Sequence, residues 1–351
     1  MNRVNGDNRR RRVLLIYTGG TIGMKTDPES GALVPFDFTH IHQEFPVIQR
    51  LNVDIEVLPF DPIDSSNASP ALWRALAAKI EENYNLFDGF VVLHGTDTMS
   101  YTSSALSFML HGLAKPVVFT GSQIPIGVLR TDGRENLITA IEIAAATDSE
   151  GRARVPEVSL YFQNRLFRAN RSTKQSAERL SAFASFNYPA LADVGVNIQY
   201  NMSAIAPYAP DFSDEFRISE SLSDEVVIVK LFPGIRPATL RAMLIDSGAR
   251  GVVLETYGAG NAPTSEWFVE LVKEAIQRGV VVVNVSQCKD GAVQMHLYET
   301  GLALQEAGVV SGHDMTIEAA VTKLMYVLGK NLPLSEALNL MRRPLRGEFT
   351  L

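Results

Sequence analysis

Residues 12–23, RVLLIYTGGTIG, join a short apolar run to a loop rich in glycine and threonine. Residues 13–17 carry no charge, which is typical of a strand that is buried on both faces of a sheet. Gly19, Gly20 and Gly23 follow at once and give the backbone freedom to turn. A buried strand that ends in such a loop is typical of the first strand of an α/β domain.

Predicted helices and strands alternate along the following part of the chain. Ser69 and Pro70 predict the start of a helix that continues to Tyr84, because serine is a favoured N-cap and proline fits the first helical turn. Helices are also predicted at 98–113 and 136–146, and strands at 12–17, 55–60, 90–93, 117–120 and 158–162. This alternation indicates a mostly parallel sheet.

Residues 201–224 interrupt the alternation with five serines, five acidic residues and no sustained periodicity. We therefore predict a linker there, with the domain boundary near residue 215. Beyond it, strands are predicted at 226–231, 251–255 and 280–285, and helices at 237–245, 266–277, 316–328 and 334–341.

The predicted fold class is α/β, with a larger N-terminal α/β domain that has a mostly parallel sheet and a smaller C-terminal α/β domain of flavodoxin-like type. The predicted boundaries are a disordered basic tail at 1–11, the N-terminal domain at 12–200, the linker at 201–224 and the C-terminal domain at 225–351.

The charge balance excludes a polyanion as an expected partner. The 351 residues include 32 Lys and Arg against 39 Asp and Glu, a formal charge of −7 that repels nucleic acid. The run Arg9 to Arg12 is interpreted as a solvated tail rather than a nucleic-acid-binding arm.

Apolar runs and cysteine content suggest the compartment. No apolar run approaches the roughly 20 residues that span a bilayer, so no membrane association is expected. The apolar run behind the arginines is too short for a secretory signal. The single cysteine, Cys288, cannot form an internal disulfide and is expected to be a small buried apolar residue. We therefore expect a cytoplasmic protein.

The sequence lacks the motifs of several common site types. Gly19, Gly20 and Gly23 do not have the spacing of a dinucleotide fingerprint, and there is no Walker A string, nucleophile elbow or zinc-protease motif. His40 and His42 have no third ligand at suitable spacing, so no metal site is expected. No cofactor is predicted.

The remaining polar residues favour chemistry by hydroxyl groups. Thr21 and Thr96 follow predicted strands, and a threonine needs a neighbouring base, for which a lysine kept neutral can serve. Lys174 is the candidate, although a lysine in a polar loop is usually a solvated charge. Asp64, Ser65, Ser66 and Asp97 form a set suited to a zwitterion such as an amino acid. The first three are equally ordinary turn and capping residues.

The sequence resembles the bacterial-type L-asparaginase family, in its cytoplasmic type I branch. The resemblance is carried by Thr18-Gly19-Gly20-Thr21-Ile22-Gly23 and His94-Gly95-Thr96-Asp97-Thr98-Met99, and it continues over nearly the whole chain. Further matches are Asp64 to Ser66, Ser103 to Phe108, Thr120 to Gln123, Asn170 to Lys174 and Tyr257 to Pro263.

The resemblance implies hydrolysis of L-asparagine to L-aspartate and ammonia without metal or cofactor, by a homodimer or homotetramer. It also implies that the N-terminal domain is catalytic. By motif position, Thr21 is the expected nucleophile, and Thr96 with Lys174 is expected to activate the second nucleophile or the hydrolytic water. Asp97 is expected to bind the substrate's α-amino group. Asp64, Ser65 and Ser66 are expected to hold its α-carboxylate, and the backbone near Gly95 and Thr96 to supply oxyanion donors.

The chain departs from the family pattern in two places. Residues 26–35 contain no tyrosine, whereas many members have one in this loop that assists the nucleophile. Some type I members also have an allosteric asparagine site, whose positions here are Thr173, Glu255, Asn261 and Cys288. Those members carry arginine where this chain has Glu255, and an anion there repels a ligand carboxylate. We therefore expect that the enzyme either lacks asparagine activation, with a vestigial allosteric site, or has a reorganised site.

Two alternatives stay open. One is a non-catalytic sensor of asparagine or aspartate, favoured by the missing tyrosine and by Glu255. It is disfavoured by the joint presence of Thr21, Thr96, Asp97 and Lys174. The other is the asparaginase-like subunit of a tRNA-dependent amidotransferase, which is expected to have an additional N-terminal domain and a partner subunit.

Overall fold

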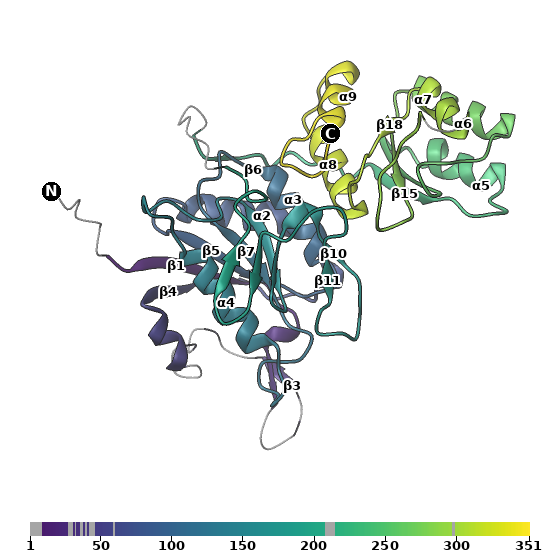
Figure 1. Ribbon diagram of the computed structural model, residues 1–351. Coiled ribbons are helices and arrows are strands. Elements are labelled where there is room, and N and C mark those ends of the chain that lie inside the picture. The colour runs from purple at the N-terminus through teal and green to yellow at the C-terminus, as the bar shows by residue number, and fades with distance from the viewer. Residues whose placement is uncertain are drawn as a thin grey trace. The chain divides into compact units, whose positions relative to one another are not determined.

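The computed structural model describes residues 9–26, 31, 33–35, 38, 41, 46–58, 60–207, 215–296 and 299–351. The chain forms two compact units, drawn in Figure 1. Unit 1 comprises Met1–Ser185 and Pro189–Ser219, and unit 2 comprises Phe186–Tyr188 and Glu220–Leu351.

Unit 1 is built on an eight-stranded sheet with the order β13-β12-β9-β8-β7-β5-β1-β4. Its strands are β1 (Arg11–Tyr17), β4 (Val53–Leu58), β5 (Gly89–Leu93), β7 (Val117–Thr120), β8 (Val158–Phe162), β9 (Arg165–Arg168), β12 (Ala192–Val194) and β13 (Ile198–Tyr200). The pairs among β4, β1, β5, β7 and β8 are parallel, and the pairs from β8 to β13 are antiparallel.

The order of the parallel strands determines where a ligand site is expected. Numbered along the chain, they lie in the order 2-1-3-4-5, which is that of flavodoxin. The order reverses between β1 and β5, so the loops after these two strands lie at a switch point at the carboxyl edge of the sheet. Ligands of open α/β sheets bind at such a switch point.

The helices of unit 1 are α2 (Pro70–Asn83), α3 (Met99–Met109) and α4 (Gly133–Ala145). Pro70 occupies the first turn of α2, as predicted, but the Ser69 side chain makes no capping hydrogen bond. The predicted helix 98–113 is too long, because Leu110 and His111 leave α3 to form β6 (Leu110–His111).

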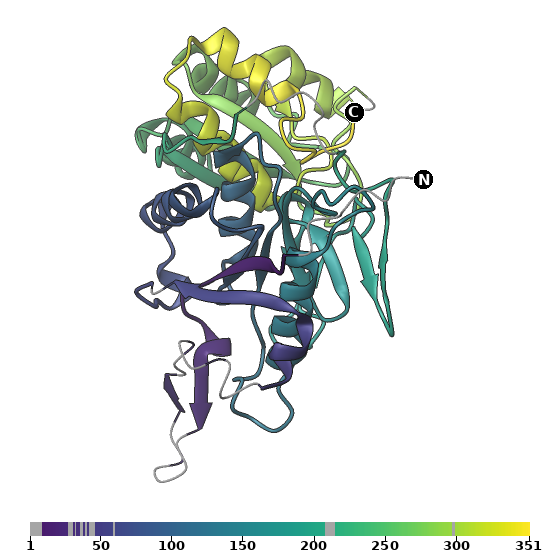
Figure 2. The same ribbon diagram turned by 90° about the vertical axis from the view of Figure 1, so that its left-hand side faces the viewer.

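Short elements carry the loops of unit 1. They are η1 (Thr21–Gly23), η3 (Pro46–Leu51), η4 (Ser65–Asn67), η5 (Ala169–Arg171), the pair β2 (Met24–Thr26) and β3 (Leu33–Pro35), the pair β10 (Thr173–Lys174) and β11 (Phe183–Ala184), and β14 (Arg217–Ile218), which pairs with β6. The hairpin of β2 and β3 extends away from the sheet of unit 1, as Figure 2 shows.

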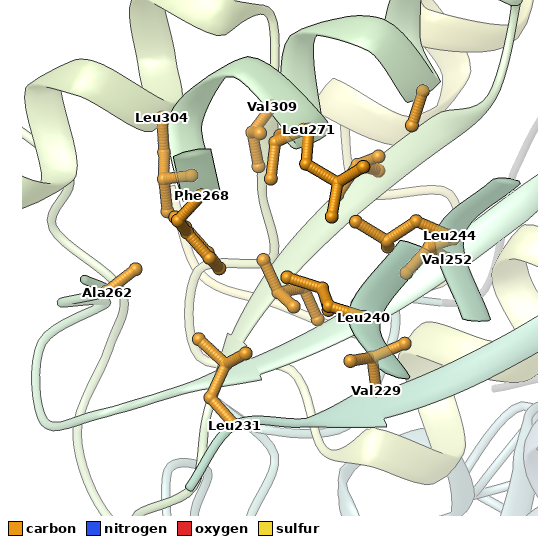
Figure 3. Close-up of a cluster of buried hydrophobic side chains, with 14 of the residues drawn as sticks. Val229, Leu231, Leu240, Leu244, Val252, Ala262, Phe268, Leu271, Leu304 and Val309 are labelled. Carbon is orange, nitrogen blue, oxygen red and sulfur yellow. The ribbon is translucent and has the colours of Figure 1, made fainter. Parts of the chain in front are cut away.

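Unit 2 contains a four-stranded parallel sheet in the order β15 (Val226–Lys230), β16 (Gly251–Thr256), β17 (Val281–Ser286) and β18 (Val310–Ser311). Its helices are α5 (Pro237–Arg241), the π-helical η6 (Ala242–Asp246), α6 (Glu266–Gln277), α7 (Glu299–Ala307), α8 (Ile317–Gly329) and α9 (Leu334–Arg342). Figure 3 shows its core, in which Leu240, Leu244 and Phe268 pack with the strand residues Val229 and Val252.

A buried ion pair anchors the end of the chain within unit 2. Lys323 Nζ lies 2.6 Å from Glu348 Oε1, and both side chains are fully buried. The ammonium also donates to the carbonyls of Met341 and Arg343, and the Glu348 carboxylate accepts from the Leu345 and Arg346 N–H groups. All these partners satisfy charges that burial otherwise penalises.

The predicted α/β class, with a larger mostly parallel domain and a smaller parallel one, is confirmed. The flavodoxin order belongs to unit 1, however, whereas the strands of unit 2 lie in simple chain order. The antiparallel strands β9, β12 and β13 and the elements α7 and β18 were not predicted.

Two predicted segments differ from the structure. The predicted disordered tail is wrong at Arg9 to Arg11, because Arg11 begins β1 and Arg9 and Arg11 both pair with Asp88. Residues 1–8 lie outside the described residues. The predicted linker 201–224 begins and ends inside packed structure, since Ile205 is buried and β14 pairs with β6. No helix in the described part of the chain is long and apolar enough to cross a membrane.

Candidate active site

The loops that follow β1, β4 and β5 meet at the switch point of unit 1. The Thr18 N–H donates to the Leu93 carbonyl at 2.9 Å, and the Ile63 N–H donates to the Thr18 carbonyl at 2.9 Å. These bonds join the ends of the strands and bring their loops into contact.

Glycines allow this close approach. A Cβ atom on Gly20 would lie 2.4 Å from Gly95 Cα, and one on Gly95 would lie 2.5 Å from Ser65 Oγ. Gly20 also has a φ of 92°, which side chains rarely adopt. The glycines of the two motifs therefore let the backbones at Gly20 and Gly95 come into contact and leave room for the Ser65 side chain beside Gly95.

Thr21 begins η1, directly after Gly20, and its side chain is exposed. Among the described residues its hydroxyl has no hydrogen-bond partner. The Tyr17 ring fills the space that a side chain at position 23 would need, and so packs against this turn. Thr21 is thus presented on a well-packed turn beside the loop that carries Thr96.

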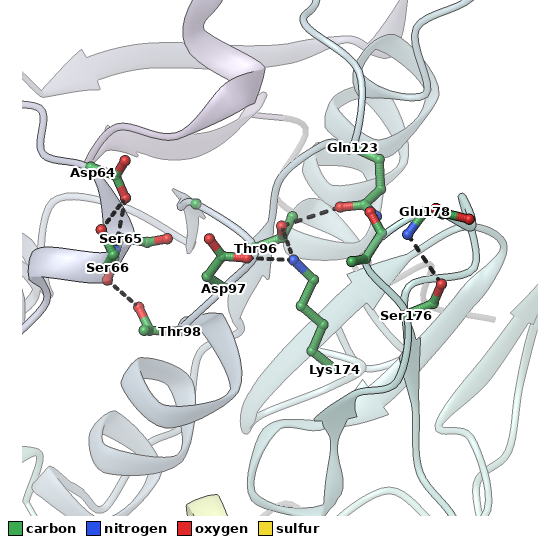
Figure 4. Close-up of polar contacts among 12 residues, drawn as sticks. Asp64, Ser65, Ser66, Thr96, Asp97, Thr98, Gln123, Lys174, Ser176 and Glu178 are labelled. Atoms are coloured by element: carbon green, nitrogen blue, oxygen red, sulfur yellow. Dashed lines mark hydrogen bonds and ion pairs between the residues drawn. The ribbon is translucent and has the colours of Figure 1, made fainter.

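Lys174 contacts two polar residues of the motif His94 to Met99, namely Thr96 and Asp97 (Figure 4). Its Nζ donates to Thr96 Oγ1 at 2.8 Å and lies 2.6 Å from Asp97 Oδ1. The Lys174 side chain is 19% exposed, whereas that of Asp97 is 67% exposed. Asp97 therefore faces solvent and is accessible to a further cation, while Lys174 is held beneath it.

Gln123 and Asp132 are residues of the site that sequence reasoning missed. The Thr96 hydroxyl donates to Gln123 Oε1 at 3.2 Å (Figure 4), and the Gln123 amide donates to the carbonyls of Ala177 and Arg179. The Asp132 carboxylate accepts from the Gln123 and Ile124 N–H groups at 3.0 Å each. Gln123 lies three residues after the predicted strand 117–120, so it is expected at the same edge of the sheet as the other site residues. This position is the signal by which the sequence could have identified it.

The Asp64 segment forms a compact turn next to Gly95. Asp64 Oδ1 accepts from the Ser66 N–H at 2.8 Å and from the Ser66 hydroxyl at 2.7 Å. These hydrogen bonds hold the pKa of the Asp64 carboxyl below its usual value. The Ser65 carbonyl accepts from the Thr98 hydroxyl at 2.7 Å, which fixes the turn to the start of α3 (Figure 4). The structure therefore shows the capping role of Asp64 in this segment.

The motif His94 to Met99, the second of the two motifs that carry the family resemblance, begins with a buried histidine. His94 is 1% exposed, and its Nδ1 lies 2.8 Å from the Gly95 carbonyl oxygen. Burial lowers the pKa of His94 to about 4. Its Nε2 has no hydrogen-bond partner in the described structure.

The residues of the expected vestigial allosteric site lie in both units. Thr173 precedes Lys174 in β10 of unit 1, whereas Glu255, Asn261 and Cys288 belong to unit 2. Glu255 is 5% exposed at the end of β16, and its carboxylate lies 3.4 Å from Lys230 Nζ. Cys288 is exposed, so its expected burial is wrong.

A metal site was not expected. His40 and His42 lie outside the described residues. Among the residues that are described, no group of three or more His, Cys, Asp or Glu is arranged to hold a metal ion.

The fold and the site place the chain in the asparaginase family. The family model "Asparaginase, N-terminal" matches residues 12–206, and "Glutaminase/Asparaginase C-terminal domain" matches residues 225–341. The chain therefore belongs to this family, as the resemblance implied.

Particular relatives span the whole chain. L-asparaginase 1 of Escherichia coli K12 is 40% identical, over 97% of this chain and 98% of its own length. The crystal structure of L-asparaginase I from Vibrio cholerae has a TM-score of 0.87 and 40% identity, and covers 97% of this chain and 100% of its own. The mouse 60 kDa lysophospholipase is 41% identical over 97% of this chain, which spans 63% of that protein.

Proposed function

We propose that the protein is an L-asparagine amidohydrolase, which releases L-aspartate and ammonia. The observation that carries the proposal is the position of Lys174, whose ammonium contacts Thr96 and Asp97 beside the turn that presents Thr21. The names of the E. coli and V. cholerae relatives support the same activity.

The roles of the residues follow from their chemistry. Thr21 is the nucleophile, because its hydroxyl is exposed on the turn and free for a substrate carbonyl. Thr96 and Lys174 form the proton-transfer set, since they are hydrogen-bonded to each other at 2.8 Å. To act as a base, Lys174 uses the lone pair of a neutral amine, which still has N–H groups to donate to Thr96 Oγ1.

The polar groups of the site are suited to binding a zwitterion. The exposed Asp97 carboxylate binds the substrate ammonium, which then competes with Lys174 for the same oxygens. Asp64, Ser65 and Ser66 hold the α-carboxylate end, for which the Ser66 hydroxyl and N–H have to exchange Asp64 Oδ1 for the substrate oxygen. The Thr96 N–H, which has no acceptor among the described residues, is available to the oxyanion that forms on the amide carbonyl oxygen when the carbon is attacked.

We also propose that the enzyme is cytoplasmic, forms a homodimer or homotetramer, and is not activated by asparagine. The last point rests on Glu255, a buried carboxylate that repels a ligand carboxylate in unit 2. A non-catalytic sensor and an amidotransferase subunit are the alternatives that the experiment below separates from hydrolysis.

The test is ammonia release by the purified protein from L-asparagine, L-glutamine and D-asparagine over a wide concentration range. We expect L-asparagine to be hydrolysed fastest, with a hyperbolic dependence on concentration and without added tRNA. A protein that binds L-asparagine without releasing ammonia is a sensor, and release that requires a partner and tRNA indicates an amidotransferase subunit. A sigmoidal dependence contradicts the loss of activation.

A further inference from the structure

The histidine that opens the second motif has no place in the chemistry described so far. His94 is buried at the end of β5, two residues before Thr96, and its ring contacts the Phe119 ring with 6.2 Å between centroids. The backbone around it is tightly packed, since a Cβ on Gly121 would lie 2.5 Å from the His94 carbonyl oxygen. The ring therefore has little space in which to move.

The hydrogen bond of the ring fixes its tautomer. The Gly95 carbonyl oxygen can only accept, so His94 Nδ1 carries the proton in their 2.8 Å contact. Because burial keeps the ring neutral, Nε2 is then an acceptor, and it has no partner in the described part of the chain. A leucine or phenylalanine would fill the same space without leaving a buried nitrogen unpaired, so packing alone does not account for a histidine here.

The hydrogen bond also orients the next peptide group. The Gly95 carbonyl and the Thr96 N–H belong to one planar trans peptide, so they point in opposite directions. The carbonyl points to the buried ring. The Thr96 N–H consequently points away from the ring, and it donates to none of the described residues.

We infer that His94 is a positioning residue, which holds the Gly95–Thr96 peptide so that the Thr96 N–H is directed at the developing oxyanion. This inference rests on the proposed amidase function. Without the Nδ1–H donor, the Gly95 carbonyl loses its only partner among the described residues and the peptide is free to rotate. An oxyanion donor acts mainly in the transition state, so its misalignment lowers kcat more than it raises KM.

The test compares kcat and KM for asparagine in three substitutions. His94→Asn keeps an N–H donor close to the position of Nδ1, whereas His94→Leu removes the donor and His94→Gln places it farther from the backbone. We expect His94→Leu and His94→Gln to lower kcat by about 10- to 100-fold with KM changed less than about threefold. We expect His94→Asn to retain kcat within about threefold.

Ser159→Ala is the matched control, because the Ser159 hydroxyl is also buried and unpartnered in the sheet of unit 1. We expect it to leave both constants unchanged. If His94→Leu does not fold, the comparison of Asn with Gln decides the question. The inference is overturned if Asn and Gln lower kcat equally, or if Leu or Gln leaves kcat unchanged. An inactive wild-type protein overturns the proposed function instead.

Discussion

One cation, the Lys174 ammonium, holds two polar residues of the site together. Lys174 donates to the Thr96 hydroxyl and pairs with the Asp97 carboxylate, and these two acceptors differ in exposure. The less exposed contact, between Lys174 and Thr96, is suited to proton transfer. The exposed Asp97 carboxylate is suited to binding a substrate ammonium. One side chain therefore links binding to chemistry.

Replacement of Lys174 tests this link. Lys174→Met keeps the length of the side chain but removes the charge, and we expect kcat for asparagine to fall by at least about 10³-fold. Folding stability should change by less than about 1 kcal/mol, because the partner Asp97 is largely exposed. Steady-state kinetics and urea unfolding measure the two effects.

Lys79→Met is the control, since Lys79 pairs with Glu82 on the exposed surface of α2. We expect its kinetics to match those of the wild type. A Lys174→Met protein with more than one tenth of the wild-type kcat contradicts the role given to the lysine.

The buried His94 predicts a particular dependence of stability on pH. The folded pKa of about 4 lies below the ordinary 6.5, so the unfolded chain binds a proton where the folded chain does not. The stability is complete above pH 6.5 and is lost as the pH falls toward about 4. Between pH 7 and pH 4.5, the wild type should lose about 2–3 kcal/mol more than His94→Asn in urea unfolding. Equal losses in the two proteins contradict the prediction.

At the scale of elements, the site depends on how closely two loops approach. Gly20 after β1 and Gly95 after β5 are in backbone contact, and neither loop has space for a side chain there. The parallel order of the strands places these loops at the switch point, and the glycines let the two backbones come into contact there.

We predict that Gly20→Ala disrupts this approach. The added methyl group would lie 2.4 Å from Gly95 Cα, and the φ of 92° is strained for alanine, so the loops have to separate. We expect kcat/KM for asparagine to fall by at least about 100-fold.

Gly195→Ala is the matched control, because a Cβ at Gly195 meets nothing within 4 Å. Its kcat/KM should equal that of the wild type. Equal activity of the two alanine variants would show that the close approach of the loops is not needed.

The elements differ in how well the sequence predicts them. The runs that form β5, β7 and β8 are fully buried, so their continuous apolar pattern identifies them. Strands β12 and β13 are short and half exposed, and their pairing depends on the antiparallel return after β8. The local pattern carries no such information.

The residues of the site also differ in how well the sequence predicts them. Thr21, Thr96 and Lys174 stand in motifs with unusual residue types, which made them visible without a structure. His94 and Gln123 also stand in motifs, but their contacts with the Gly95 carbonyl and the Thr96 hydroxyl exist only in the folded chain. Composition was misleading at 201–224, where a polar stretch contains the packed strand β14.

At the scale of the whole molecule, the end of the chain is essential to unit 2. The ion pair of Lys323 and Glu348 is fully buried, and burial lowers the pKa of Lys323 while the carboxylate opposes this shift. The carboxylate also organises the turn at 345–348 through backbone hydrogen bonds. The last residues are therefore part of the core structure of this unit.

Glu348→Gln should leave a buried ammonium without a counter-charge. We expect it to lower the free energy of unfolding by about 3–5 kcal/mol in urea titrations. The control Glu82→Gln removes an exposed partner of Lys79 and should change stability by less than about 1 kcal/mol. Equal effects of the two substitutions contradict a structural role for the buried pair.

The central claim is that a threonine hydroxyl at the switch point attacks the amide of asparagine. The most direct measurement is the rate of ammonia release from L-asparagine by Thr21→Ala and Thr21→Ser beside the wild type. The account predicts that Thr21→Ala loses at least about 10³-fold in kcat while Thr21→Ser, which keeps the hydroxyl, retains measurable turnover. A Thr21→Ala protein that hydrolyses asparagine within about tenfold of the wild-type rate would contradict the account.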